Sequence, residues 1–303
     1  MRVYSPNGTE DRHKHRAILV IAHPGHELRV HRWLEIARPD VWVLTDGSGH
    51  THISRIDSTT RVLEATGATP GSVYGNMRDA DLYDAILGFD HRHFIELAEQ
   101  LAASLMRNDV AKIVGDAQEG YSPAHDVCRL VINTAVRLVE HKTGKQIANY
   151  DFTLAGAPNQ CPDELRPTSL WLHLDDAAFA RKLRAAHNYP ELRAEVESAL
   201  NGGDETFGQH SDLAERARST FGVTNANNFR VECLRPVDTR IVSLSSDNAE
   251  PSFYEAYGEK QVRAGYYTHV LRFREHIQPL TAALDSHCRQ AGDFARSTGS
   301  LAC

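Results

Sequence analysis

The sequence has no paired cysteines, no long apolar run and no excess of basic residues. Its five cysteines are odd in number, widely spaced and free of any C-x-x-C pair. This excludes a disulfide framework and a zinc site built from thiolates. Cysteine usage therefore predicts a reducing, cytoplasmic environment.

No eighteen apolar residues run together, and the segment from Met1 to Lys14 has no apolar core of a signal peptide. The sequence thus predicts neither a membrane span nor secretion. Lysine and arginine, 33 together, are outnumbered by 40 aspartates and glutamates, which gives a formal net charge of -7. Nucleic-acid binding calls for a dominant basic face, so no nucleic-acid partner is expected.

The chain does contain enough apolar material for a core, with 41% hydrophobic residues over 303 positions. The run 18–21 consists of four large aliphatic residues, which is typical of a strand buried on both faces. It ends in a turn that carries His23, His26 and Glu27. Polar residues beyond the carboxyl end of such a strand occupy the position where open α/β sheets place their chemistry.

Hydrophobic periodicity predicts alternating strands and helices along most of the chain. Strands are expected at 18–21, 41–44, 112–114, 147–152 and 229–234. Helices are expected at 27–37, 58–68, 93–106, from 127 onward, 175–187, 190–200 and 255–284, with 81–93 undecided and a frayed tail after His287. This order indicates an α/β fold with a mainly parallel sheet and helices on both faces.

Three histidines are candidate metal ligands. His23 and His26 lie three residues apart at a strand-to-helix turn, and His125 follows another strand that ends at the same edge. Three nitrogen ligands with a fourth position left for water make up a catalytic zinc site. The alternative is that they are structural, because the chain has 17 histidines and an H-x-x-H spacing alone is weak.

Five fragments, in order, resemble the LmbE-like, or PIG-L, family of zinc-dependent N-deacetylases. The stretch Ala-His-Pro-Gly-His-Glu at 22–27 resembles the family's Ala-His-Pro-Asp-Asp-Glu motif. The other fragments are Thr-Asp-Gly at 45–47, Arg-x-x-Glu at 61–64, Ser-Pro-Ala-His at 122–125 and the helix at 179–187. The resemblance implies a Rossmann-like hydrolase domain over residues 15–235, followed by a helical C-terminal extension over 236–303.

The resemblance also implies roles for individual residues. Position by position, the metal ligands fall on His23, His26 and His125, with Zn²⁺ or another divalent ion as the cofactor. The family's substrate-binding arginine falls on Arg61, although an exposed arginine on a helix is more often only solvated. Tyr121 and His187 are further candidates for contacting the substrate, as an oxyanion donor or an acid.

Gly25 departs from the family pattern, because it stands where the family has its general-base aspartate. Either another carboxylate takes over or hydrolysis is lost. The catalytic candidates are Glu27, Asp126 and Asp116, with Glu119 also nearby in the sequence. For Glu27 and Asp126 the alternative is a structural role in the first turn of a helix.

The expected function is a metal-dependent amidohydrolase that removes an acyl group from a small N-acylated amino sugar. The alternative is a non-hydrolytic relative that keeps the fold as a carbohydrate-binding or accessory protein. A dinucleotide-binding protein is disfavoured because no G-x-G-x-x-G follows the first strand. A homo-oligomer is left open.

Overall fold

The computed structural model describes residues 16–193, 196–197, 226–239 and 251–299. Within these residues seven strands form one sheet in the order β3-β2-β1-β4-β5-β7-β6. The strands are β1 (Ala17–Ile21), β2 (Asp40–Thr45), β3 (Thr69–Met77), β4 (Lys112–Asp116), β5 (Ala148–Phe152), β6 (Leu170–His173) and β7 (Val231–Pro236). The first five pair in parallel, and β7 runs antiparallel to both β5 and β6. The predicted α/β fold with a mainly parallel sheet is confirmed.

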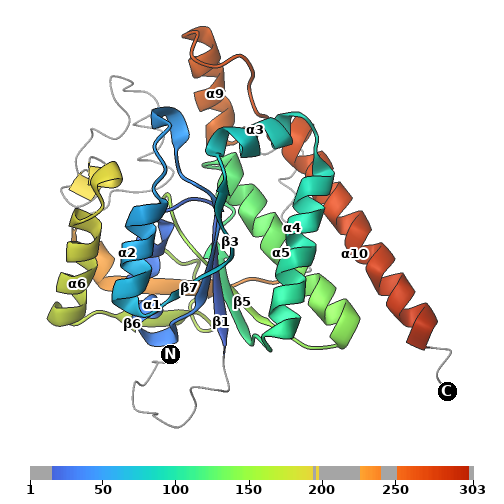
Figure 1. The fold of residues 1–303 in the computed structure, drawn as a ribbon, viewed down its shortest axis with the longest axis horizontal. Helices are drawn as coiled ribbons and strands as arrows, with labels where there is room; N and C mark the ends of the chain where they lie inside the picture. Colours follow the sequence, from blue (N-terminus) through green and yellow to red (C-terminus); the bar gives the residue numbers. More distant parts are fainter. Residues whose placement is uncertain (1–15, 194–195, 198–225, 240–250, 300–303) are drawn as a thin grey trace.

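Helices cover both faces of the sheet (Figure 1). One face carries α1 (His31–Ala37), α2 (Ile56–Thr66) and α6 (Asp176–His187). The other carries α4 (His91–Arg107), α5 (Pro123–Thr143) and α10 (Gln278–Gly299). The helices α3 (Asp79–Leu87) and α9 (Phe253–Arg263) lie beyond the end of the sheet at which α5 begins.

The strand β1 is central to the core. Its side chains alternate between the two helical layers: Ile18 and Val20 join one buried cluster, whereas Leu19 and Ile21 join the other. A strand between two apolar layers needs apolar residues at every position. This explains why the strand at 18–21 could be predicted from an unbroken aliphatic run.

Two strands were not predicted, because neither follows a buried-strand pattern. β3 is an edge strand of mostly half-buried and exposed residues that contains Pro70 and Gly71. An edge strand tolerates proline and needs no continuous apolar face. β6 is a short edge strand of four residues. The undecided region 81–93 contains most of α3 and the start of α4.

The C-terminal prediction of one helix over 255–284 was wrong. The chain instead forms α9 and α10, joined through a turn at Gly265 (φ 80°) and a π-helical turn at Phe273–Ile277. The expected fraying after His287 was also wrong, because α10 continues to Gly299.

The helix predicted at 27–37 is divided into a 3-10 segment, His26–Val30, and α1. Of the helix expected at 190–200, the structure describes residues 190–193, which begin with a 3-10 turn at Pro190–Leu192, and 196–197; the remaining positions lie outside the described residues.

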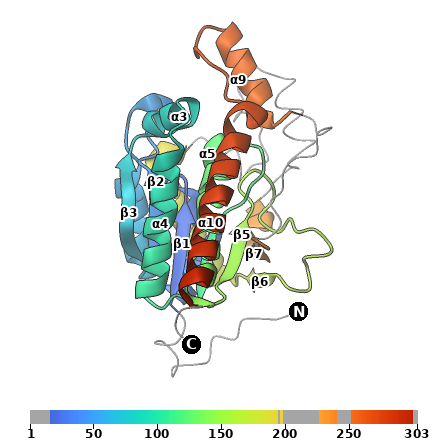
Figure 2. The same ribbon diagram turned by 90° about the vertical axis from the view of Figure 1, so that its right-hand side faces the viewer.

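The C-terminal helices share the core of the sheet. Ile277, Leu280 and Leu284 belong to the same buried cluster as Ile18 and Val20. Figure 2 shows α10 running along α5 and α4. The domain boundary expected at residue 235 stays a prediction. Among the described helices none is long and apolar enough to cross a bilayer.

Because Leu280 is only 1% exposed, we expect Leu280→Ala to lower the free energy of unfolding by about 2 to 5 kcal/mol. Urea denaturation followed by circular dichroism should show one transition shifted as a whole. The exposed Gln290→Ala on the same helix should change stability by less than about 0.5 kcal/mol. A shift confined to a separate minor transition would contradict the shared core.

Candidate metal centre

Two neighbouring parallel strands bring the three histidines together. β1 leads directly into the turn with His23 and His26, and β4 leads through a loop to His125 in the first turn of α5. Since β1 pairs with β4 in parallel, both polar segments begin at the same edge of the sheet. The turn and the loop therefore face each other.

The three imidazole rings lie in mutual contact. Their centroids are 5.4 Å apart for His23 and His26, 5.5 Å for His23 and His125, and 4.6 Å for His26 and His125. A tetrahedral zinc ion about 2.1 Å from three imidazole nitrogens separates the ring centroids by about 5 Å. Within the described residues, however, no three His, Cys, Asp or Glu side chains already have the spacing of a metal site. Ion binding would therefore require these side chains to move from the positions seen here.

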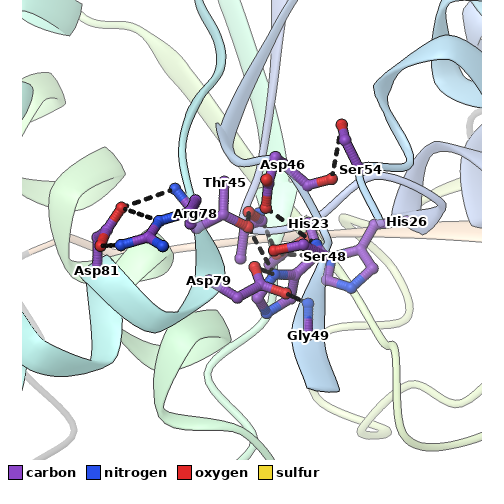
Figure 3. Close-up of polar contacts among 12 residues, drawn as sticks. His23, His26, Thr45, Asp46, Ser48, Gly49, Ser54, Arg78, Asp79 and Asp81 are labelled. Atoms are coloured by element: carbon purple, nitrogen blue, oxygen red, sulfur yellow. Dashed lines mark hydrogen bonds and ion pairs between the residues drawn. The ribbon is translucent and has the colours of Figure 1, made fainter. Parts of the chain in front are cut away.

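The tautomer of His23 follows from its two neighbours (Figure 3). Its Nδ1 lies 2.8 Å from Thr45 Oγ1 and 2.9 Å from Asp79 Oδ1. The Thr45 hydroxyl donates its proton to the Ala22 carbonyl, 3.0 Å away, so its oxygen can only accept from His23. With acceptors on both sides, the ring carries its proton on Nδ1 and leaves the Nε2 lone pair free.

Asp79 is held in turn by the loop after β2. Its Oδ2 accepts the backbone N–H of Gly49 at 2.7 Å. Burial by itself raises the pKa of Asp79, but the hydrogen bonds and charge of its neighbours, His23 foremost, lower that pKa well below its usual range. Asp79 is thus an ionised carboxylate that fixes the orientation of His23.

His26 has a corresponding partner in Asp116. Asp116 Oδ2 lies 2.9 Å from His26 Nδ1 and accepts the backbone N–H of Ala22 at 2.8 Å. Burial lowers the pKa of His26, and Asp116 opposes that shift. Burial also lowers the pKa of His125 strongly, and a proton on His26 or His23 would lower it further. His26 and His125 are therefore neutral, which is the form that binds metal ions.

Two buried polar atoms of this cluster have no hydrogen-bond partner among the described residues: His125 Nδ1 and Asp116 Oδ1. A buried polar atom without a hydrogen-bond partner destabilises the folded protein, and so lowers its free energy of unfolding. An unpaired imidazole nitrogen beside two oriented imidazoles fits a cation-binding site. His23, His26 and His125 are accordingly the residues that could hold a metal ion.

Arg129 fixes the end of β4. It is 2% exposed, and its guanidinium donates to the Asp116 carbonyl (2.6 Å), Asn149 Oδ1 (3.0 Å) and the Tyr150 carbonyl (3.1 Å). These contacts tie α5 to the end of β4 and to the first half of β5. Sequence reasoning did not single out Arg129, because a buried arginine cannot be recognised without its partners.

Gly25 occupies a backbone conformation that disfavours other residues. Its φ is 105°, and a Cβ added there would lie 2.3 Å from Leu192 Cδ1. Its N–H donates to Glu27 Oε2 at 2.7 Å, and Glu27 Oε1 accepts from the Thr59 hydroxyl at 2.9 Å. Burial raises the pKa of Glu27 to about 7 against these hydrogen bonds. Both oxygens of the Glu27 carboxylate are therefore engaged in hydrogen bonds that hold the turn in place.

Asp126 is held in a similar way at the start of α5. Its Oδ1 accepts the backbone N–H groups of Glu119 and Gly120, each at 3.1 Å. Burial raises the pKa of Asp126 to about 7, which these hydrogen bonds partly offset. Glu119 in turn accepts the N–H groups of Leu154 and Ala155. Asp126 and Glu119 thus order the loop between β4 and α5.

The expected substrate-binding residues are placed differently from one another. The Tyr121 ring lies 6.2 Å from the His125 ring, so it adjoins the centre. Arg61 lies on the exposed side of α2, where its guanidinium donates to Ser58 Oγ at 2.7 Å. His187 is exposed at the end of α6. The structure thus groups Tyr121 and Asp116 with the three histidines. The roles predicted for the three histidines, the three catalytic carboxylates and the three substrate-binding residues all stay predictions.

Asp79, like Arg129, supports the candidate centre and was missed by sequence reasoning. It follows β3, the edge strand that the apolar pattern did not reveal. An aspartate immediately after a strand at the carboxyl edge of the sheet is the signal that identifies it once β3 is known.

No protein-family model matches the chain, and no curated protein matches it. Similar solved structures include the A40926 pseudoaglycone deacetylase Dbv21, with 17% identity and a TM-score of 0.44 over 75% of this chain and 98% of that chain. A deacetylase triple mutant from the teicoplanin biosynthetic pathway has 16% identity and a TM-score of 0.42 over 77% of this chain and 100% of that one. The zinc-inhibited form of teicoplanin deacetylase Orf2 has 12% identity and a TM-score of 0.41, with the same coverage. Similarity at this level establishes neither the family nor the activity of this chain.

We expect Gly25→Ala to destabilise the protein by about 1 to 3 kcal/mol, because an L-residue is strained at this φ. Chemical denaturation measures the effect. Gly144→Ala is the matched control, since Gly144 also has a positive φ (70°) but no atom within 4 Å of an added Cβ. Any excess at Gly25 over Gly144 reports the contact with Leu192 together with the less favourable φ of 105° at Gly25. A Gly25→Ala protein as stable as the parent would contradict this assignment.

Proposed function

We propose that this chain is a metal-dependent hydrolase that removes the N-acyl group of an amino sugar or a similar small molecule. The observation that carries the proposal is the convergence of three imidazole rings at the carboxyl edge of the sheet, two of them oriented by buried carboxylates. This is the edge at which open α/β sheets bind their ligands. A carboxylate on the far nitrogen of a histidine is typical of metal centres.

His23, His26 and His125 would hold the metal ion, with Zn²⁺ as the first candidate for three imidazole donors. A bound divalent ion would supply Lewis acidity toward an amide carbonyl and would acidify water. Asp79 and Asp116 keep His23 and His26 in the tautomer that leaves Nε2 free. Tyr121, whose ring lies 6.2 Å from that of His125, would contact the substrate.

Asp116 is the carboxylate that best combines with this chemistry. Glu27, Asp116 and Asp126 are all buried, and among the described contacts of these three it is Asp116 that hydrogen-bonds a histidine of the candidate centre. Its Oδ2 accepts two hydrogen bonds, whereas its Oδ1 has no partner among the described residues. Asp116 is therefore the carboxylate proposed to support proton transfer during hydrolysis, in place of the side chain that Gly25 lacks.

A second candidate function is binding without hydrolysis. Gly25 has no side chain, and its φ of 105° disfavours any other residue. Glu27 and Asp126 are both engaged by backbone N–H groups. A carbohydrate-binding or accessory protein would need the same fold without a general base.

The first test combines metal analysis with amine release from N-acetylglucosamine. We expect the purified protein to contain about one divalent ion per chain by mass spectrometry, and to lose its activity with a chelator and regain it with Zn²⁺. His125→Ala should retain less than about a tenth of both metal and activity, because it removes one of three ligands. The exposed His187→Ala is the control for metal content.

The outcomes separate the two candidates. Metal-free purified protein, or full activity in His125→Ala, would refute the hydrolase. Metal and sugar binding without any amine release would favour the binding protein.

Asp79→Asn should weaken metal binding by about 10-fold to 100-fold, because the neutral amide no longer supports the His23 imidazole. Competition with a chromogenic chelator measures the affinity without turnover. Asp81→Asn is the matched control, since Asp81 lies on the same first turn of α3 but pairs with the exposed Arg78. Equal affinities of the two variants would show that Asp79 does not position His23.

A further inference from the structure

Two cysteines that are far apart in the sequence lie together beside the antiparallel strands of the sheet. Cys161 belongs to the connection between β5 and β6, residues 153–169, and Cys233 belongs to β7. Cys161 is 8% exposed and Cys233 is 3% exposed. We call these two residues the thiol pair. The proposed reaction and the candidate metal centre involve neither of them.

The pairing of β6 with β7 brings Ser169 to the thiol pair. Cys233 lies opposite Trp171 in the antiparallel register, and Ser169 immediately precedes β6. Diagonal neighbours across two antiparallel strands are within reach of each other's side chains. The Ser169 and Cys233 side chains are hydrogen-bonded. Ser169 is itself 1% exposed, so this contact lies in the interior.

Ser169 and Cys233 both contact Cys161. The Ser169 hydroxyl donates its proton to the Leu165 carbonyl at 2.8 Å, so its oxygen is the acceptor toward a thiol. That oxygen lies 3.4 Å from Sγ of Cys161. The Cys161 and Cys233 side chains are also hydrogen-bonded to each other. The two sulfur atoms are therefore neighbours, as formation of a disulfide requires.

The two thiols differ in how an oxidant reaches them. Burial, assisted by the neighbouring Cys161, raises the pKa of Cys233 to about 12. Because the thiolate is the form that attacks a disulfide, Cys233 is not the first to react. Cys161 is preceded by the exposed residues 159–160 and followed by the exposed residues 162–164. Local opening of this connection would uncover Cys161 while β7 stays paired in the sheet.

We propose that Cys161 and Cys233 form a reversible intramolecular disulfide on exposure to a low-molecular-weight disulfide such as glutathione disulfide. The Cys161 thiolate attacks one sulfur of that oxidant and releases one glutathione, which leaves a mixed disulfide at Cys161. The Cys233 thiolate then attacks the Cys161 sulfur and releases the second glutathione. Two protein thiols are oxidised, one glutathione disulfide is reduced, and the two thiol protons end on the two glutathiones. This inference goes beyond the proposed function and does not depend on it.

The disulfide would fasten the second half of the connection to β7. The first half is already held, since Glu119 Oε2 accepts the N–H groups of Leu154 and Ala155 at 2.9 Å and 3.1 Å. A covalent link between Cys161 and Cys233 restricts the unfolded chain, and so raises the free energy of unfolding. Under reducing conditions the thiol pair stays in the hydrogen-bonded form described above.

Peptide mapping of the full chain tests the proposal. The protein is incubated with glutathione disulfide or with reduced glutathione, alkylated, digested with trypsin and analysed by mass spectrometry. With the disulfide, we expect most of the protein to yield a peptide pair that joins Cys161 to Cys233 and is two hydrogen atoms lighter than the separate thiol peptides. Dithiothreitol should remove this link, and reduced glutathione should not produce it.

Single variants separate the two thiols. Cys161→Ser should form no link. Cys233→Ser should keep glutathione on Cys161, because the thiol that would release it is missing; where this variant fails to fold, Cys161→Ser provides the test. Cys288→Ser is the matched control, since Cys288 is also buried but its thiol contacts the Thr134 carbonyl. This control should form the link like the parent.

Urea denaturation measures the consequence for stability. The oxidised parent should unfold with an equilibrium constant at least about tenfold smaller than that of the reduced parent, and Cys161→Ser should show no such difference. Free Cys161 and Cys233 thiols after oxidation, a parent that carries only bound glutathione, or a link between other cysteines would overturn the proposal. A link between Cys161 and Cys233 that leaves stability unchanged would overturn its stabilising role.

Discussion

The Asp116 carboxylate is the interaction on which the candidate centre depends. One of its oxygens accepts two hydrogen bonds. One comes from the backbone N–H of Ala22, just beyond β1, and the other from Nδ1 of His26. It thereby joins the ends of the two central strands and orients a histidine with the same atom. Arg129 holds the Asp116 carbonyl from α5, so a buried guanidinium supports a buried carboxylate at the point where the site begins. Such charges are tolerated in a core because each is hydrogen-bonded.

Gly25 allows the sharp turn after β1 but supplies no side chain that could act as a general base. The positive φ and the N–H contact to Glu27 let the chain turn sharply and bring His23 and His26 close together. A side chain at this position would strain the turn and approach Leu192. The turn therefore favours placement of the imidazoles over a local general base. In the proposed hydrolysis, proton transfer is therefore assigned to a carboxylate from another strand, Asp116.

The C-terminal helices combine two roles that differ in their physical basis. α10 buries apolar side chains in the core of the sheet, which is a contribution to stability. α9 instead extends beyond the sheet (Figure 1) and presents partly exposed aromatic rings near the histidines. Contacts of Glu255 with the Phe273 N–H and of Glu259 with Arg272 tie α9 to the segment before α10. A segment with no recognisable motif can in this way shape the surroundings of a site built elsewhere.

The sequence alone determined the central strands, the main helices and the grouping of His23, His26 and His125, because unbroken apolar runs and polar strand ends are local properties. It could not reveal β3, since an exposed edge strand carries no apolar pattern, and for that reason it missed Asp79. Nor could it distinguish Glu27 and Asp126, which hold backbone N–H groups, from Asp116, which contacts a histidine. Those assignments depend on contacts between residues up to 94 positions apart. Only the packing of distant segments creates such contacts, so the tertiary structure was needed to assign them.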